Sequence, residues 1–169
     1  MKRIILIVMI IVLFASTAVA SDIRGNNWGA TIDEVASIEQ TEAEYVDYTN
    51  YENIFIQYKV SLKGKKGVIL YLFTREPETL AQGIYLIQFY ASIEDRDKYT
   101  LSIIETLDKK YGDKIYEKHN PITIEYIAYW KTPTTAIRLS ASIGEVGYKV
   151  VIQYRDIERF PLEIPADEL

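Results

Sequence analysis

Residues 54–62 read Ile54-Phe55-Ile56-Gln57-Tyr58-Lys59-Val60-Ser61-Leu62, and along them apolar side chains alternate with mostly polar ones. A period of two is typical of a strand that buries one of its faces. The next apolar run, residues 68–73, is apolar on both faces and therefore predicts a strand in the middle of a sheet. Lysines and glycines fill the segment between the two runs, which predicts a hairpin turn.

The same patterns predict the other elements of the chain. Thr31 and Glu34 have the spacing of a capping box, which starts a short helix that runs to about residue 40. Helical spacing returns over residues 95–111, where Gly112 supplies the C-terminal stop. Residues 39–50 read as a connector, and residues 118–121 as a loop. Further strands are predicted over residues 84–90, 122–130, 135–143 and 148–154.

These elements predict an α+β fold in which two helices pack as a layer on one face of an antiparallel sheet. The predicted order is α-βββ-α-βββ, and short links between successive strands imply antiparallel neighbours. The two helix-plus-three-strand units suggest a duplicated module. We expect a single domain over residues 21–160 and an extended tail over residues 161–169, where Pro161 and Pro165 disfavour regular structure.

The first twenty residues have the pattern of a secretory signal peptide. Lys2 and Arg3 precede an unbroken run of apolar and small residues that ends in Ala18-Val19-Ala20. A basic start, an apolar stretch and small residues two apart predict cleavage after Ala20 and a periplasmic or secreted product without a membrane span. If the segment stayed uncleaved, it is just long enough to leave a protein anchored by a single span.

Composition excludes several classes of function. The 169-residue chain contains no cysteine, which excludes disulfide bonds, thiolate metal sites, a cysteine nucleophile and a lipid-modified anchor. Its formal net charge is −5, and removal of residues 1–20 makes it more negative. A negative surface repels phosphate backbones and anionic lipids, so we expect neither nucleic acid nor a membrane surface as a partner.

The residues that could carry catalysis do not form a recognisable pattern. His119 is the only histidine, and the chain has no Gly-x-Ser-x-Gly sequence to supply a nucleophile beside it. A single histidine without cysteine does not make a usual zinc site, and no spacing singles out a pair of carboxylates. We therefore expect a protein that is not an enzyme and that needs no metal or cofactor.

The fourteen tyrosines are more informative. If the helices cover one face of the sheet, the opposite face carries aromatic and polar residues together, a mixture that suits protein contact. Cross-strand aromatic pairs also stabilise any exposed sheet, so a structural role stays open. Another envelope protein or a peptide is the expected partner, and the alternative is a small-ligand carrier with an aromatic-lined cavity between helices and sheet. The candidate partner-binding residues are Phe55, Tyr71, Ile127, Tyr129 and Arg138.

Residues 24–35, which begin Arg24-Gly25-Asn26-Asn27-Trp28-Gly29, resemble the opening of a group of exported bacterial domains in which such a turn feeds a short helix. Residues 83–85 and 107–112 also fit that group. In architecture the chain resembles the beta-lactamase-inhibitor-protein-like fold and the related small outer-membrane assembly lipoproteins, whose understood members bind proteins and are not enzymes. It lacks the anchoring cysteine of the lipoproteins and the disulfides of the inhibitors, so neither a tether nor β-lactamase inhibition carries over.

Overall fold

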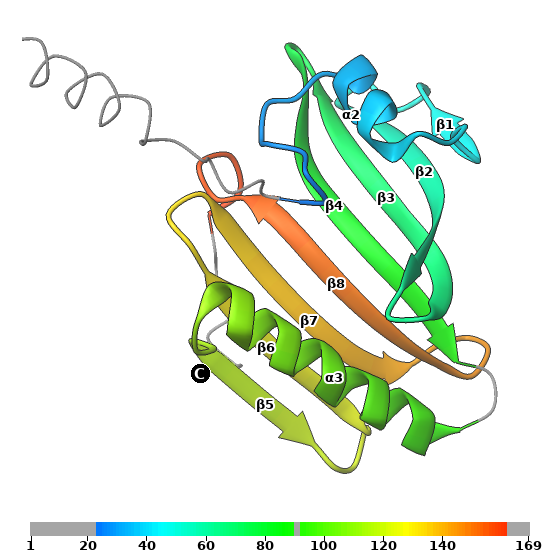
Figure 1. Ribbon diagram of the computed structural model, residues 1–169, viewed down its shortest axis with the longest axis vertical. Helices are drawn as coiled ribbons and strands as arrows, with labels where there is room; N and C mark the ends of the chain where they lie inside the picture. The colour runs from blue at the N-terminus through cyan, green and yellow to red at the C-terminus, as the bar shows by residue number, and fades with distance from the viewer. Residues whose placement is uncertain (1–22, 90–91, 162–169) are drawn as a thin grey trace, which may run out of the picture.

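The computed structural model describes residues 23–89 and 92–161, and these form one eight-stranded antiparallel sheet with two helices (Figure 1). The strands lie side by side in the order β1-β2-β3-β4-β8-β7-β6-β5, so that β4 and β8 meet in the middle. The helices are α2 (Ile32–Glu39) and α3 (Ile93–Tyr111). The strands are β1 (Tyr45–Asp47), β2 (Asn53–Leu62), β3 (Lys65–Arg75), β4 (Glu78–Phe89), β5 (Tyr116–Asn120), β6 (Glu125–Lys131), β7 (Thr135–Ile143) and β8 (Tyr148–Asp156).

The predicted order α-βββ-α-βββ was wrong, because each helix is followed by four strands. The two additional strands, β1 and β5, lie at opposite edges of the sheet and pair only with β2 and β6 respectively. Both are short and without an apolar alternation long enough to predict a strand, and their strand character comes from pairing with a neighbour. His119 therefore lies on an edge strand and not in a loop.

The predicted two-layer packing was wrong as well. Helix α3 packs on β6, β7, β8 and β4, whereas the eight-residue α2 lies against β4 and reaches β3 through the hydrogen bond between Tyr71 and Glu39 (Figure 1). A helix of two turns cannot cover β2 and β3, so the helices do not form a continuous layer over the sheet. The sheet itself is the dominant element.

The helix ends follow the predicted capping chemistry. Thr31 is the N-cap of α2, and its hydroxyl accepts the backbone N–H of Glu34 while the Glu34 carboxylate accepts the backbone N–H of Thr31. Gly112 ends α3 with φ at 84°, as predicted from its position. Helix α3 begins at Ile93, two residues before the predicted start, because Ser92 caps it.

Two strand boundaries differ from the prediction. Strand β4 begins at Glu78 and not at residue 84, since it pairs with β3 directly from the hairpin turn. Strand β6 begins at Glu125 and not at residue 122. The side chain of Asn120 accepts the backbone N–H of Ile122 at 3.0 Å and holds residues 121–124 in a turn, where Ile124 has a φ of 53°.

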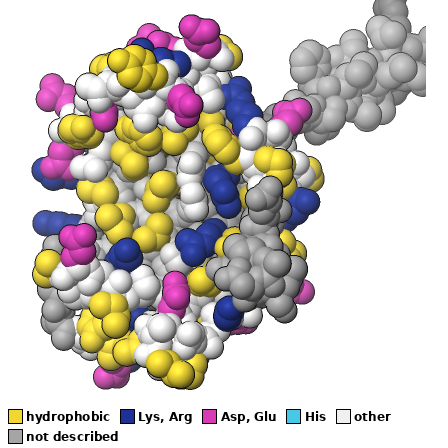
Figure 2. Space-filling model, turned by 180° about the vertical axis from the view of Figure 1, so that it is seen from behind, with side chains coloured by type: hydrophobic (Ala, Val, Ile, Leu, Met, Phe, Trp, Pro, Cys, Tyr) yellow, Lys and Arg dark blue, Asp and Glu magenta, His cyan; other side chains and the backbone are white. Residues whose placement is uncertain are grey.

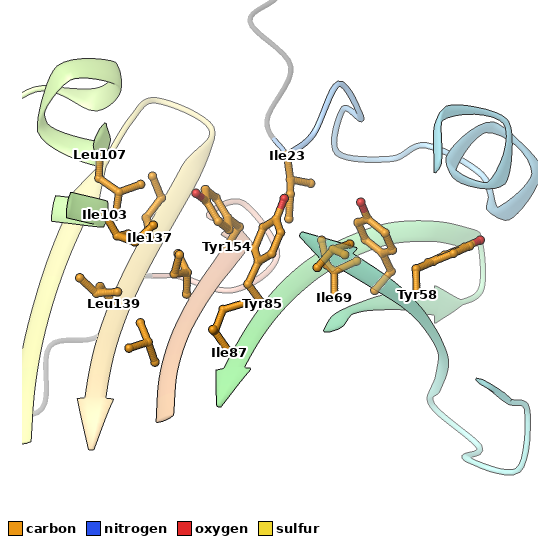
Figure 3. Close-up of a cluster of buried hydrophobic side chains, with 14 of the residues drawn as sticks. Ile23, Tyr58, Ile69, Tyr85, Ile87, Ile103, Leu107, Ile137, Leu139 and Tyr154 are labelled. Atoms are coloured by element: carbon orange, nitrogen blue, oxygen red, sulfur yellow. The ribbon is translucent and has the colours of Figure 1, made fainter. Parts of the chain in front are cut away.

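The hydrophobic core lies between the helices and one face of the sheet, which we call the inner face. Ile103 and Leu107 of α3 point toward Ile137 and Leu139 of β7 (Figure 3). The opposite face, which we call the outer face, carries the alternate side chains of all eight strands, as the register of the pairs requires.

Candidate functional site

The outer face has an aliphatic centre formed by strands that are distant in sequence. Leu70 of β3 lies opposite Ile84 of β4, and Leu86 of β4 lies opposite Val151 of β8. Leu86 is the most exposed of these residues, with 37% of its surface accessible to solvent. Hydrophobic side chains accordingly gather in the middle of this face (Figure 2). The aliphatic centre consists of Val68, Leu70, Leu72, Ile84, Leu86 and Val151.

Basic side chains surround the aliphatic centre, although the whole chain is acidic with a net charge of −5. The strand register brings only Asp47 and Glu125 to the outer face as acidic residues. Lys and Arg side chains flank the hydrophobic patch in the same view (Figure 2). The basic residues that the register places on this face are Lys59, Lys66, Lys118, Lys131, Arg138, Lys149 and Arg155.

A groove of about 760 Å³ lies over β2, β3 and β4 on this face. Val68 and Leu86 line it, with Lys66 at one rim. At another rim the Nζ of Lys59 lies 2.6 Å from a carboxylate oxygen of Glu44. The hydrogen bond from Lys59 lowers the pKa of the Glu44 carboxyl and keeps it ionised. The groove combines an apolar floor with charged rims, the composition of a polypeptide-binding surface.

The structure brings three of the five predicted binding residues together. Tyr129 lies opposite Arg138 in the β6–β7 pair, and the Nε of Arg138 donates to the Tyr129 hydroxyl at 3.1 Å. Ile127 is the next outer-face residue along β6. Phe55 is also on the outer face but on β2, far across the sheet from the other three.

The placement of Tyr71 on the open face was wrong. Strand β3 is apolar on both faces, so its pattern did not show which side Tyr71 takes. Its side chain points to the inner face, is fully buried and forms an edge contact with Tyr58 at 5.9 Å between ring centroids.

The groove itself was not predicted from the sequence patterns. The alternation of residues 84–90 and 148–154 does put Leu86 and Val151 on one side of their own strands. What the sequence does not give is the pairing of β4 with β8, which joins the two halves of the chain. Leu86 and Val151 become neighbours only through that pairing.

Tyr71 belongs to a buried polar network that anchors the N-terminal segment. The Arg24 guanidinium donates two hydrogen bonds of 2.9 Å to the Glu39 carboxylate, whose side chain is 2% exposed. The Tyr71 hydroxyl donates to the same carboxylate, and burial followed by this bond raises the pKa of Tyr71. Each charged group in this network has a partner of opposite charge, so we assign the network a structural role and not a binding role.

The polar side chains that lie near His119 also form hydrogen bonds within the protein. His119 borders a groove of about 300 Å³ between α3 and β5–β6, together with Arg96 and Glu117. Arg96 donates to the Ile124 carbonyl at 2.8 Å, and the Tyr126 hydroxyl donates to Glu117 at 2.7 Å. Within residues 23–89 and 92–161 no group of three or more His, Cys, Asp or Glu side chains is arranged to hold a metal ion.

Several aromatic residues on the inner side form ring contacts with one another inside the hydrophobic core. Ring centroids are 6.0 Å apart for Tyr85 and Tyr154, and 5.2 Å apart for Phe89 and Tyr99. These contacts give the rings a core-packing role. The ligand-carrier alternative gains no support from them.

In comparisons with known proteins, no family model, no curated protein and no solved structure matches the chain. The resemblance to the beta-lactamase-inhibitor-protein-like fold stays a prediction. In the part of the chain that the structure describes, no helix has the length and apolar character needed to cross a membrane.

Proposed function

We propose that this chain is a non-enzymatic protein-binding domain whose outer face binds an acidic polypeptide segment with interspersed apolar side chains. The observation that carries the proposal is the charge distribution. An acidic chain places Lys66, Lys149 and Arg155 around an aliphatic surface with few carboxylates. Complementary charge at the rim selects a partner and speeds its association, while the apolar floor supplies the affinity.

A polypeptide fits this surface better than other polyanions. Proteins that bind single-stranded nucleic acids stack the bases on exposed aromatic rings, whereas the aliphatic centre of this face consists of Val, Leu and Ile side chains. The remaining surface carries the excess negative charge of the chain and repels extended phosphate backbones or anionic lipid surfaces.

A displayed library of random peptides tests the proposal. We expect selection on the folded protein to enrich peptides that contain Asp or Glu together with Leu, Ile or Phe. The Leu86→Glu variant places a carboxylate on the groove floor and should lower the affinity for these peptides by about tenfold or more. Leu101→Glu is the matched control, because Leu101 is 61% exposed on α3, away from the groove.

Three outcomes of this selection would overturn the proposal. They are the absence of acidic enrichment, equal weakening by both variants, or preferential binding of single-stranded DNA or of anionic vesicles offered as competitors.

The N-terminal pattern falls on residues outside those that the structure describes. We propose that it directs export and is removed after Ala20. The basic start, the apolar run and the small residues Ala18 and Ala20 at its end support this proposal. Intact-mass measurement of the purified exported protein should give Ser21 as the first residue, and a retained N-terminus would contradict cleavage.

A further inference from the structure

The edge strand β1 covers only part of its neighbour β2. Strand β2 pairs with β3 along all 10 of its residues, whereas β1 pairs only with Phe55, Ile56 and Gln57 (Figure 1). Just before β1 begins, the backbone N–H of Glu44 donates to the Gln57 carbonyl at 2.8 Å. Beyond Gln57, no strand in the described part of the chain pairs with this edge of β2.

The backbone groups of Lys59 and Ser61 point outward from this open edge. In an antiparallel sheet the N–H and C=O of one residue point to the same side, and those of the next residue point to the other side. Gln57 uses its carbonyl on the β1 side, so Lys59 and Ser61 also point away from β3. Within residues 23–89 and 92–161 these backbone groups have no hydrogen-bond partner, and both residues are exposed. Such an edge is a surface to which a further strand can be added.

The open edge also borders the groove over β2, β3 and β4. Lys59, Val60 and Ser61 line that groove together with Val68 and Leu86. A polypeptide that pairs with the edge can therefore continue over the groove floor. The backbone pairing and the apolar floor belong to one continuous surface.

The two sides of the open edge differ in chemistry. On the inner side Val60 belongs to the hydrophobic core, and Leu62 and Ala43 pack against that core. On the outer side the exposed Lys66 lies opposite Ser61 in the β2–β3 pair. Because the Ser61 side chain is small, the long Lys66 side chain can extend past it toward a carboxylate on an added strand. An added strand therefore fits this edge best when apolar and acidic side chains alternate along it.

A second copy of this chain fits the edge less well than an acidic strand. Two copies paired through β2 would bring the Lys66 side chains of both to one face, and like charges destabilise a strand pair. Lysine on an edge strand is a device that discourages pairing between identical chains. The Glu44 carboxylate at this rim is compensated by Lys59 at 2.6 Å, so it does not oppose an acidic ligand.

We propose that the acidic polypeptide binds as an additional antiparallel strand on β2, paired with the backbone of Lys59 and Ser61. The acidic side chains of that strand lie on the outer side near Lys66, and its apolar side chains lie on the inner side beside Val60. The rest of the polypeptide contacts the groove floor. This inference rests on the proposed function and adds to it the way in which the partner binds.

Matched substitutions at Ser61 test the inference. Ser61→Pro removes the outward N–H, whereas Ser61→Ala removes only the hydroxyl. Proline is tolerated where an edge N–H faces solvent, so the fold should stay intact, and thermal unfolding checks this. The probe is a short labelled peptide of alternating Glu and Leu residues, measured by fluorescence anisotropy. We expect Ser61→Pro to lower its affinity by about tenfold or more and Ser61→Ala by about twofold at most.

Methylated peptides test the same bonds without a change in the protein. In an antiparallel pair the Glu residues opposite Lys59 and Ser61 direct their N–H groups toward β2, and the Leu N–H groups point away. N-methylation of the Glu residues should therefore lower the affinity by about tenfold or more, while N-methylation of the Leu residues should change it little. Equal losses, or a loss confined to the peptide with methylated Leu, would overturn the inference.

The outcomes separate this inference from the proposed function. An affinity that falls with Leu86→Glu but not with Ser61→Pro would overturn strand addition and support an acidic ligand on the groove floor. Failure of every acidic peptide to bind, those from the displayed library included, would overturn both. A dimer of the protein in sedimentation that Ser61→Pro dissociates would overturn the inference, because a second copy would then occupy the edge.

Discussion

At the scale of single residues, the Tyr71 hydroxyl has a special role because its acceptor is the buried Glu39 carboxylate. Hydrogen bonds to charged groups contribute more to stability than bonds between neutral groups. We expect Tyr71→Phe to lower the free energy of unfolding by about 1.5–3 kcal/mol. Tyr99→Phe, which removes a 3.0 Å bond to the neutral Leu62 carbonyl, should cost about 0.5–1.5 kcal/mol. Urea unfolding checks the comparison, and equal losses would contradict the role given to Glu39.

The burial of Tyr85 makes the stability of the folded protein decrease at alkaline pH. Burial raises the pKa of Tyr85 to about 12, against the opposing effect of Arg24, from the ordinary value of 10.0. The neutral phenol is therefore favoured in the folded state, and its contribution to stability is complete below pH 10 and is lost between pH 10 and 12. In that pH window, the free energy of unfolding of the Tyr85→Phe variant should fall by up to about 1.4 kcal/mol per pH unit less than that of the unsubstituted protein. Parallel pH curves for the two proteins would contradict this account.

At the scale of elements, the β3–β4 contact depends on Gly67. A Cβ at this position would lie 2.4 Å from the Leu86 carbonyl oxygen, a backbone atom that cannot move without disturbing the strand pair. We expect Gly67→Ala to lower the free energy of unfolding by about 1–3 kcal/mol. Gly144→Ala is the matched control, because its nearest neighbour would be 3.7 Å away. Thermal unfolding of both variants decides, and similar melting temperatures would contradict the predicted strain.

The elements also show how far the sequence could predict the fold. Periodicity located β2, β3, β7, β8 and both helices, since their side chains bury a continuous stripe or alternate face. Strands β1 and β5 left no such signal, because pairing at a sheet edge makes them extended without burying alternate residues. Tyr71 was assigned to the wrong face because the sequence of β3 is apolar on both faces and so does not alternate.

At the scale of the whole molecule, the candidate site depends on strand order. The pairing of β4 with β8 joins two halves that the sequence presents as separate modules, and it brings Lys66 and Lys149 to one surface. The net charge alone predicted an acidic molecule. It could not predict this basic face, because it does not show where the charges lie. The predicted residues Tyr129 and Arg138 do lie on the outer face, opposite each other on β6 and β7.

Site-specific photocrosslinking in the producing cell tests the central claim, that the outer face binds an acidic polypeptide. A photoreactive residue in place of Leu86 should form an adduct with a polypeptide, and the adducted peptide should carry Asp or Glu beside apolar residues. The same residue in place of Leu101 on α3 should not form it, and combining the Leu86 probe with Lys66→Glu and Lys149→Glu should remove it. Equal adducts at both positions, or an adduct that survives the charge reversals, would contradict the account.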